Sequence, residues 1–236
     1  MWETTVDGRV LNFHLAGVNN QNFIMRDEET GSWWQQVSGE CVLGPLKGRR
    51  LKPFDHDELT FAAWEREGAA GRVLRPDPRV EAAGQYARPD WEQRMQRVPV
   101  ATALADPDAV LPARTLVVGV EAGGAAKAYP ADALARQNPV VDTIGSAPVI
   151  VLLGEDGKSV RAFDRRLEGK TLEFFLKPGT RELLDAETGS AWDFTGASTS
   201  GALAGRRLTR LRPVKDYWFD WKQYHPETGV YLLGER

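Results

Sequence analysis

The feature of this chain that most constrains its fold is a pattern that occurs twice in the same order. Residues 27–34 follow Asp-x-Glu-Thr-Gly-Ser-x-Trp, and residues 185–192 repeat that pattern with six of eight positions identical. A second pattern, Gly-x-Leu-x-Gly-Arg-Arg-Leu, starts at Gly44 and again at Gly201. Self-similarity of this kind is the sequence signature of repeated structural units. We therefore expect two related modules.

Flanking residues extend the repeat in both directions. The upstream and downstream counterparts are Gly8, Leu11, Phe13, Phe61 and Trp64 in the first copy and Gly169, Leu172, Phe174, Trp218 and Trp221 in the second. The sequence predicts tandem modules over residues 1–78 and 100–236, joined by a linker over residues 79–99. Residues 116–163 have no counterpart before Met1, so the first module is expected to be N-terminally incomplete.

The local chemistry predicts a mainly β (α+β) fold of antiparallel strands with a few short helices. In each repeated turn an aspartate can accept backbone hydrogen bonds and a glycine can take a positive φ, which is typical of a hairpin. Residues 10–15 and 171–176 alternate apolar side chains with others, which predicts a half-buried strand in each module. These strands and the hairpins after them would form one sheet per module.

The second module contains further predicted elements. Residues 116–120 and 126–129 predict a hairpin around Gly123 and Gly124, residues 131–136 a short helix, and residues 148–153 and 160–163 two more strands. In the linker, Pro89-Asp90-Trp91 predicts a capped helix start. A first module without these strands would leave apolar faces bare. We expect the linker helix near Trp91 or a strand of the second module to cover them.

Composition excludes several partners. The 236 residues carry a formal net charge of −3 and a pI near 5.7, which gives no basic field for nucleic acid. No apolar stretch reaches the roughly 20 residues of a bilayer-spanning helix, so no membrane span is predicted. The N-terminus shows no secretory signal. The default location is cytoplasmic, and a start upstream that carried a signal peptide would make it extracytoplasmic.

The cysteine and histidine inventory predicts neither a metal site nor a cofactor. Cys41 is the only cysteine, so no intrachain disulfide or dithiol couple can form. The counterpart of Cys41 is a serine or threonine, which favours a structural role as a small buried residue. The three histidines form no H-x-x-H or H-E-x-x-H pattern. The chain is predicted to lack catalytic residues, and whether it is an enzyme is left open.

Six residues are candidates for binding. Indoles offer broad apolar faces. Trp33 is a better candidate than Trp34, Trp192, Trp218 and Trp221, because its counterpart is Ala191 and it is freer to serve a surface of one module. Paired arginines can clamp a phosphate or a carboxylate. The full set is Trp33, Asp27, Arg49, Arg50, Trp218 and His225. For each of them a folding role, as core, turn or solvated charge, is the competing interpretation.

The chain resembles the bacterial domain of unknown function 3179 proteins over essentially its whole length. Besides the repeated turns, the matching segments are residues 44–48, 128–130, 141–145, 147–151, 218–221 and 225–230. The resemblance implies no established activity. In many members it implies a C-x-x-C-type pair after the strand at 148–151, with thiol-redox or metal chemistry. That pair would fall on Gly154 and Gly157 here, so this chain departs from the pattern.

Two functions from different classes follow. The favoured hypothesis is a non-catalytic binding or structural protein whose partner is an unknown small molecule or protein, because no nucleophile, base and orienting group can be assembled. The alternative is a thiol-redox or metal-dependent protein whose C-x-x-C-type motif lies upstream of Met1. In-frame translation of the upstream DNA distinguishes the two.

Overall fold

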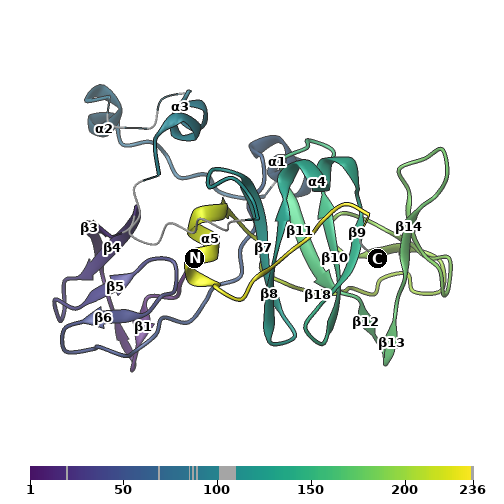
Figure 1. The fold of residues 1–236 in the computed structure, drawn as a ribbon, viewed down its shortest axis with the longest axis horizontal. Coiled ribbons are helices and arrows are strands. Elements are labelled where there is room, and N and C mark those ends of the chain that lie inside the picture. The colour runs from purple at the N-terminus through teal and green to yellow at the C-terminus, as the bar shows by residue number, and fades with distance from the viewer. Residues whose placement is uncertain are drawn as a thin grey trace.

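Two four-stranded sheets from the second half of the chain, antiparallel except for one parallel pair at the edge of the first, form the centre of the molecule (Figure 1). This computed structural model describes residues 1–19, 21–68, 70–84, 86, 88, 90–100 and 110–234. One sheet has the order β19-β7-β8-β20 and the other β18-β11-β10-β9. The strands are β7 (Leu116–Ala122), β8 (Ala125–Pro130), β9 (Val140–Ile144), β10 (Ala147–Leu153), β11 (Val160–Asp164), β18 (Thr209–Arg210), β19 (Val214–Tyr217) and β20 (Gly229–Val230).

A buried aliphatic cluster joins these two sheets. It contains Val118 and Val120 from β7 and Val149 and Val151 from β10. The predicted β7–β8 hairpin is confirmed, and so is the helix α4 (Ala131–Arg136) that follows it. The strands predicted at 148–153 and 160–163 are also confirmed, as β10 and β11. Apolar runs bounded by Gly and Asp turns were sufficient to locate these elements.

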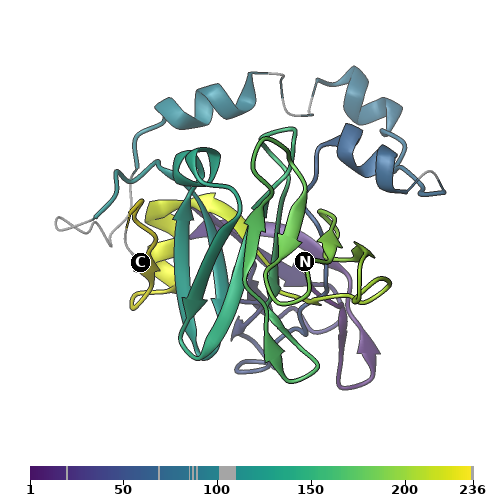
Figure 2. The same cartoon turned by 90° about the vertical axis from the view of Figure 1, so that its right-hand side faces the viewer.

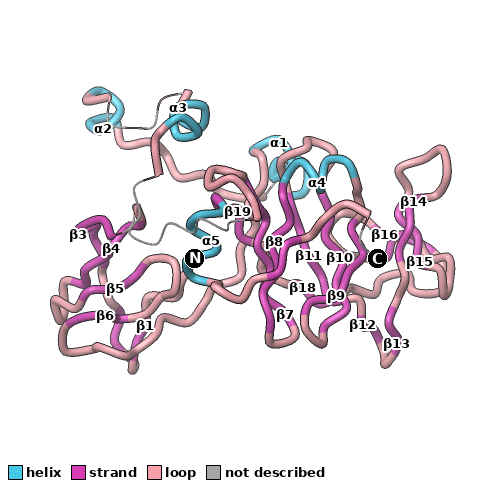
Figure 3. The backbone as a smooth tube through the Cα atoms, viewed as in Figure 1, coloured by secondary structure: helices cyan, strands magenta, loops and turns pink. Residues whose placement is uncertain are grey.

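Each end of the molecule carries a four-stranded antiparallel sheet in which consecutive strands are neighbours (Figure 1). The first meander, as we call it, contains β3 (Phe13–Asn19), β4 (Asn22–Asp27), β5 (Trp33–Gln35) and β6 (Cys41–Leu43). The second meander contains β14 (Phe174–Leu176), β15 (Leu183–Asp185), β16 (Ala191–Trp192) and β17 (Ser198–Ser200). Figure 3 shows that strands and loops make up most of the chain. The mainly β prediction is confirmed.

The central turn of both meanders has the same hydrogen bonds. Asp27 accepts a hydrogen bond from the backbone N–H of Thr30 at 2.6 Å and another from the indole N–H of Trp34 at 2.8 Å. Asp185 accepts the two corresponding bonds at 2.6 and 2.9 Å. Both tryptophans are buried. An aspartate that bonds its own turn and a buried indole explains why this residue type is needed at that place.

The strands predicted at 10–15 and 171–176 are each divided in two, which corrects the prediction. A two-stranded hairpin comes first, β1 (Thr5–Val6) with β2 (Arg9–Val10), or β12 (Arg166–Leu167) with β13 (Lys170–Thr171). The backbone N–H of Asn12 then donates to the carboxylate of Glu29 at 2.8 Å and not to a neighbouring strand. In the second copy, the backbone N–H of Glu173 donates to the carboxylate of Glu187 at 3.0 Å. The turn glutamate interrupts the ladder, which alternation alone does not reveal.

The two meanders rest on different supports. The second meander packs its Trp192 side against Ile150, Leu152 and Phe163 of the β10–β11 sheet. The first meander fills the same side with residues from the first 51 positions alone, among them Trp2. A Cβ added at Gly196 would lie 2.4 Å from Phe163, and one added at Gly39 would lie 2.9 Å from Trp2. Trp2 thus occupies, on the first meander, the place of Phe163.

Helix α5 (Trp218–Tyr224) lies between the first meander and the central sheets (Figure 1). Trp218 and Trp221 are buried against Val117 and Ala128 of the β7–β8 hairpin. The tryptophans are therefore core residues that hold the helix against the outer face of this sheet.

The opposite side of α5 meets the first meander through polar contacts. Asn22 hydrogen-bonds Asp220, and Gln35 donates to the hydroxyl of Tyr224 at 2.5 Å. The expectation that the linker helix or a strand covers the first meander is wrong, since Trp91 is half exposed and α5 makes these contacts.

Three short helices follow the first meander and run along one side of the molecule (Figure 2). They are α1 (Phe61–Glu67), α2 (Pro78–Ala82) and α3 (Trp91–Arg97). The N-cap of α3, Asp90, makes no side-chain cap hydrogen bond, so the predicted capped start is wrong in that detail. Pro89 and residues 101–109 of the predicted linker and second module lie outside the described residues. No helix in the described part of the chain is long and apolar enough to cross a bilayer.

Candidate functional site

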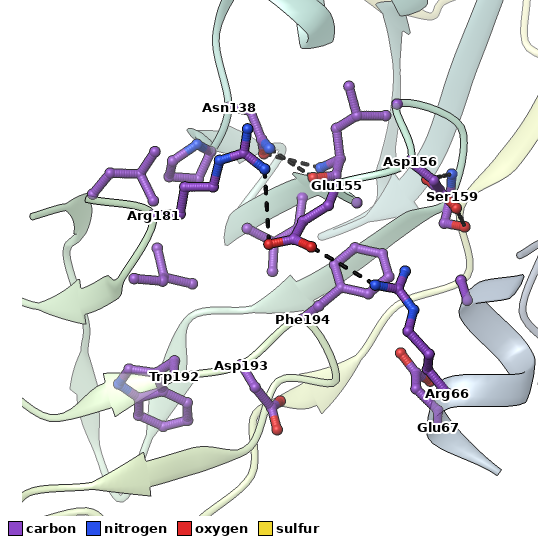
Figure 4. Close-up of a pocket in the computed structure, with 18 residues that line it drawn as sticks. Arg66, Glu67, Asn138, Glu155, Asp156, Ser159, Arg181, Trp192, Asp193 and Phe194 are labelled. Carbon is purple, nitrogen blue, oxygen red and sulfur yellow. Dashed lines mark hydrogen bonds and ion pairs between the residues drawn. The ribbon is translucent and has the colours of Figure 1, made fainter. Parts of the chain in front are cut away.

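A cavity of about 650 Å³ lies between the C-terminal half of α1, the β10–β11 turn and the second meander. Its apolar wall includes Leu152, Leu153, Leu176, Leu183, Trp192 and Phe194, and its polar side chains include Arg66, Glu67, Asn138, Glu155, Asp156, Arg181 and Asp193 (Figure 4). Pockets of this size, with a mainly apolar lining and a few convergent polar groups, are typical of small-molecule sites. We call it the cleft.

Two arginines from separate elements meet at Glu155, at the mouth of the cleft (Figure 4). Arg66 of α1 lies 3.7 Å from one carboxylate oxygen and Arg181 of the β14–β15 loop lies 3.8 Å from the other. Both distances exceed that of a hydrogen bond. The arginine side chains are 63% and 80% exposed. Neither guanidinium is therefore held tightly by Glu155, and each keeps donors available to another anion.

The turn that carries Glu155 is held by its neighbour Asp156. Asp156 accepts hydrogen bonds from the hydroxyls of Ser159 at 2.5 Å and Thr60 at 2.6 Å. Burial alone would raise the pKa of Asp156, but these bonds outweigh it and hold the pKa below its ordinary value. Thr60 is also the N-cap of α1. One carboxylate therefore fixes both the turn and the start of α1 beside the cleft.

A buried arginine lines a second cavity and bonds Glu67, which lines both cavities. The side chain of Arg161 is 6% exposed and bonds Glu67 at 2.6 Å and Asp57 at 2.8 Å. Its guanidinium also lies 4.8 Å from the ring centre of Phe194. The second cavity, of about 690 Å³, is lined by Arg161, Asp57, Phe61, Trp64 and neighbours. Since both carboxylates come from the segment after the first meander, Arg161 attaches that segment to β11.

A pair of carboxyl groups lies where the first meander meets α5. Burial, together with the charge of Asp220, raises the pKa of Asp216 to about 8. Burial also raises the pKa of Asp220, which is 8% exposed and bonded to Asn22. Neither residue lines the cleft or the second cavity. The pair lies beside the contact between α5 and the first meander, and a pKa of about 8 keeps Asp216 largely protonated at neutral pH.

The predicted binding residues of the first meander are placed as follows. Asp27 is 1% exposed and bonded within its own turn. Trp33 is half-buried on β5, next to Gly17. Arg49 pairs with Asp7 at 3.1 Å, and Arg50 with Glu40 at 3.1 Å. These side chains border neither cavity.

The remaining two candidates lie on or next to α5. Trp218 is buried under that helix. His225 stacks on Trp221 with 3.7 Å between ring centres, and its Nε2 lies 2.9 Å from Glu121. The six predicted residues are thus not brought together in one cavity, and their binding role stays a prediction. In the described chain, no three His, Cys, Asp or Glu side chains gather closely enough to hold one metal ion.

The sequence analysis missed the residues that line the cleft. Arg66, Glu155 and Arg181 belong to segments without a repeat or a motif, and only the fold brings them together. Gly154 and Gly157 are a partial signal, because both line the cleft and both were singled out as the place of the cysteine pair. The surroundings of Cys41 do not favour a reactive thiolate, since Cys41 is fully buried and burial raises the pKa of its thiol.

Comparison with known proteins places the chain in a family without an assigned activity. No curated protein and no solved structure matches it. A family model described as a protein of unknown function (DUF3179) matches residues 1–228, nearly the whole length. The chain, with its two meanders around two central sheets, therefore belongs to the DUF3179 family.

Proposed function

We propose that this protein is a non-catalytic binding protein and that its ligand is a small apolar acid bound in the cleft. The observation that carries the proposal is that Arg66 and Arg181 converge on Glu155 beside an apolar wall, in a cavity whose volume is typical of a small-molecule site. Arginine is the side chain best suited to a carboxylate, because its planar donors bind both oxygens. The apolar body of the ligand would rest on Leu153 and Phe194.

In this proposal Glu155 occupies the anion position until a ligand takes it. Its side chain is 65% exposed, so rotation into water costs little burial. The other carboxylates of the cleft have partners of their own, Asp156 at Thr60 and Ser159 and Glu67 at Arg161. Asp193 accepts bonds within its own turn, from Thr195. A carboxylate that already accepts such bonds is not available as a general base. This supports binding rather than catalysis.

The position of the cleft within the family also supports the proposal. Gly154 and Gly157, where the resemblance places the cysteine pair of many members, line the cleft. The thiol-redox or metal-dependent alternative has no support in this chain, whose single cysteine is buried in the first meander.

We further propose that the chain is a tandem duplication, with modules over residues 1–78 and 100–236. The equal turn bonds, the equal strand order and matched backbone bonds support it. Among the latter, Leu51 N–H to Gly39 and Leu208 N–H to Gly196 both measure 2.9 Å. In this proposal the two meanders are related, but only the second packs on a central sheet. Only the second meander therefore forms a wall of the cleft.

The binding proposal is tested with 1-anilinonaphthalene-8-sulfonate and 2-naphthoate, an apolar sulfonate and an apolar carboxylate. Arg66→Gln and Arg181→Gln should each weaken binding about threefold to tenfold, as expected for loss of one partly exposed charged contact. Glu155→Gln should strengthen it, since the competing anion is gone. Fluorescence and calorimetric titrations measure both effects.

The matched control is Arg79→Gln, which removes an exposed arginine of α2 that lines neither cavity and should leave both titrations unchanged. Equal weakening by Arg79→Gln and Arg181→Gln, or weaker binding in Glu155→Gln, would overturn the proposal. Competition between the two probes shows that they share the site.

A further inference from the structure

The first meander has an apolar strip that extends beyond its counterpart on the second meander. Leu15 lies opposite Met25, and Val18 lies opposite Phe23, in the β3–β4 pair. Side chains directly opposite each other share a face of the sheet, and so do residues two apart on one strand. These four residues therefore lie on one face, the face that also carries Trp34 opposite Met25. We call them the strip.

The inner end of this face is filled and its outer end is bare. Trp34 and Cys41 are fully buried, and Met25 is partly buried against their cluster. Leu15, Val18 and Phe23 are 60%, 64% and 50% exposed. Contiguous exposed apolar side chains on a sheet face mark an interaction site more often than isolated ones do.

The second meander shows what kind of surface such a face contacts. In the shared order of strands, Leu176 and Leu183 lie opposite each other as Leu15 and Met25 do. Leu183 is 7% exposed and packs in one cluster with Ile150 and Leu152 of β10. The face is therefore suited to aliphatic side chains presented by another sheet. Among the described residues, the cluster beneath the first meander includes no strand from the central sheets.

The first hairpin also exceeds its counterpart in length. Ten positions separate Leu15 from Met25 and seven separate Leu176 from Leu183. The three added residues lengthen β3 and β4, and Val18 and Phe23 lie on that extension. Extra length that adds exposed apolar side chains is unfavourable in a monomer.

We propose that the strip binds the strip of a second copy of this chain, face to face about a two-fold axis. Charge supports this occupant, because β3 carries no Asp, Glu, Lys or Arg. On β4 the two charged residues are Arg26, on the opposite face, and Asp27, which is buried. Two copies therefore bring apolar side chains together and no like charges. Two-fold dimers with self-complementary patches are the commonest closed assemblies.

Strand-to-strand pairing at the edge is not the mode we propose. β3 is the edge of its sheet, but its register shifts between Leu15 and Gly17. A bulge of this kind disturbs the ladder and protects an edge from pairing. The contact uses the face of the sheet and leaves the edge free.

The test measures the mass of the full chain by light scattering and sedimentation over a wide range of concentrations. The wild-type chain should change from its 26.2 kDa monomer to a dimer as concentration rises. Val18→Asp and Phe23→Asp should each raise the dissociation constant at least about tenfold, because a desolvated charge would face the partner's apolar strip. Circular dichroism confirms that each variant is folded.

Leu43→Asp is the matched control. Leu43 is 58% exposed on β6 of the same meander and lies opposite Trp33, on the face away from that of Trp34. This variant should dimerise as the wild type does. A wild-type chain that stays monomeric at all concentrations, assemblies that grow beyond a dimer, or equal weakening by Leu43→Asp and Val18→Asp would each overturn the proposal. A monomer that instead binds an unrelated apolar partner through Phe23 also overturns it.

Discussion

The two meanders share their internal hydrogen bonds and differ in what they rest on. Around Asp27 and Asp185 the bonds agree within about 0.1 Å. The second meander is buried on β10 and β11, whereas the first meets the rest of the molecule through α5 and polar groups. The turn residues thus determine the local structure of a meander. Its function depends on the surface it contacts, because only the second forms a wall of the cleft.

The largest expected effect tests how the two halves are attached. Arg161→Met should reduce the free energy of unfolding by about 3–5 kcal/mol, because Glu67 would keep a partly buried charge without its cation and Asp57 would keep Arg210 alone. Urea unfolding of the full chain measures the loss. Arg161→Lys keeps the charge without the planar pair of contacts and should lose less. A loss below about 1 kcal/mol would show that this contact is not what attaches α1 to β11.

The contrast between the meanders also shows how far the sequence could predict the molecule. Turns and hairpins were predicted correctly because their signals are local, in the Asp and Gly of each turn. The breaks at Asn12 and Glu173 were missed, since each depends on a glutamate about 14 to 17 positions away. The cleft was missed for the same reason on a larger scale. Arg66, Glu155 and Arg181 have no shared motif, and only the packing of three separate elements brings them together.

A matched pair of variants tests the equality of the two turns. Asp27→Ala and Asp185→Ala should each reduce the free energy of unfolding by about 2–4 kcal/mol, because each leaves a buried indole N–H and a turn amide without an acceptor. The two losses should agree within about 1 kcal/mol. Asp27→Asn, which keeps one acceptor, should cost less. A loss at one turn only would contradict the view that local bonds determine both meanders.

The contact of the first meander with α5 is tested by pH. The pKa of Asp216 is about 8 when folded and about 3.9 when unfolded. Between these values the folded chain binds the additional proton, so stability falls as pH rises from about 4 to about 8. The groups around it are Asp220 and Tyr224 on α5, Glu58, and the amide of Asn22 on β4.

Asp216→Asn should remove most of this slope and stabilise the chain at pH 8 by at least about 1 kcal/mol. Unfolding free energies of the wild type and the variant at several pH values measure it. Asp132→Asn, at an exposed carboxylate on α4, is the control and should keep the wild-type slope. A wild-type stability that rises between pH 4 and pH 8 would mean that other groups outweigh the pair.

The smallest effect concerns the repeated arginines, which the sequence offered as an anion clamp. Arg49 pairs with Asp7 at 3.1 Å and Arg206 pairs with Glu168 at 3.0 Å, and all four side chains are more than half exposed. Exposed pairs of this kind contribute little, since water and salt screen them and the long side chains lose entropy. Arg49→Gln and Arg206→Gln should therefore each change the free energy of unfolding by less than about 0.5 kcal/mol. Inorganic phosphate should bind neither variant differently from the wild type in calorimetry. If Arg49→Gln alone reduced phosphate binding, the first meander would have a ligand site of its own, and the cleft would not be the only difference between the meanders that matters for binding.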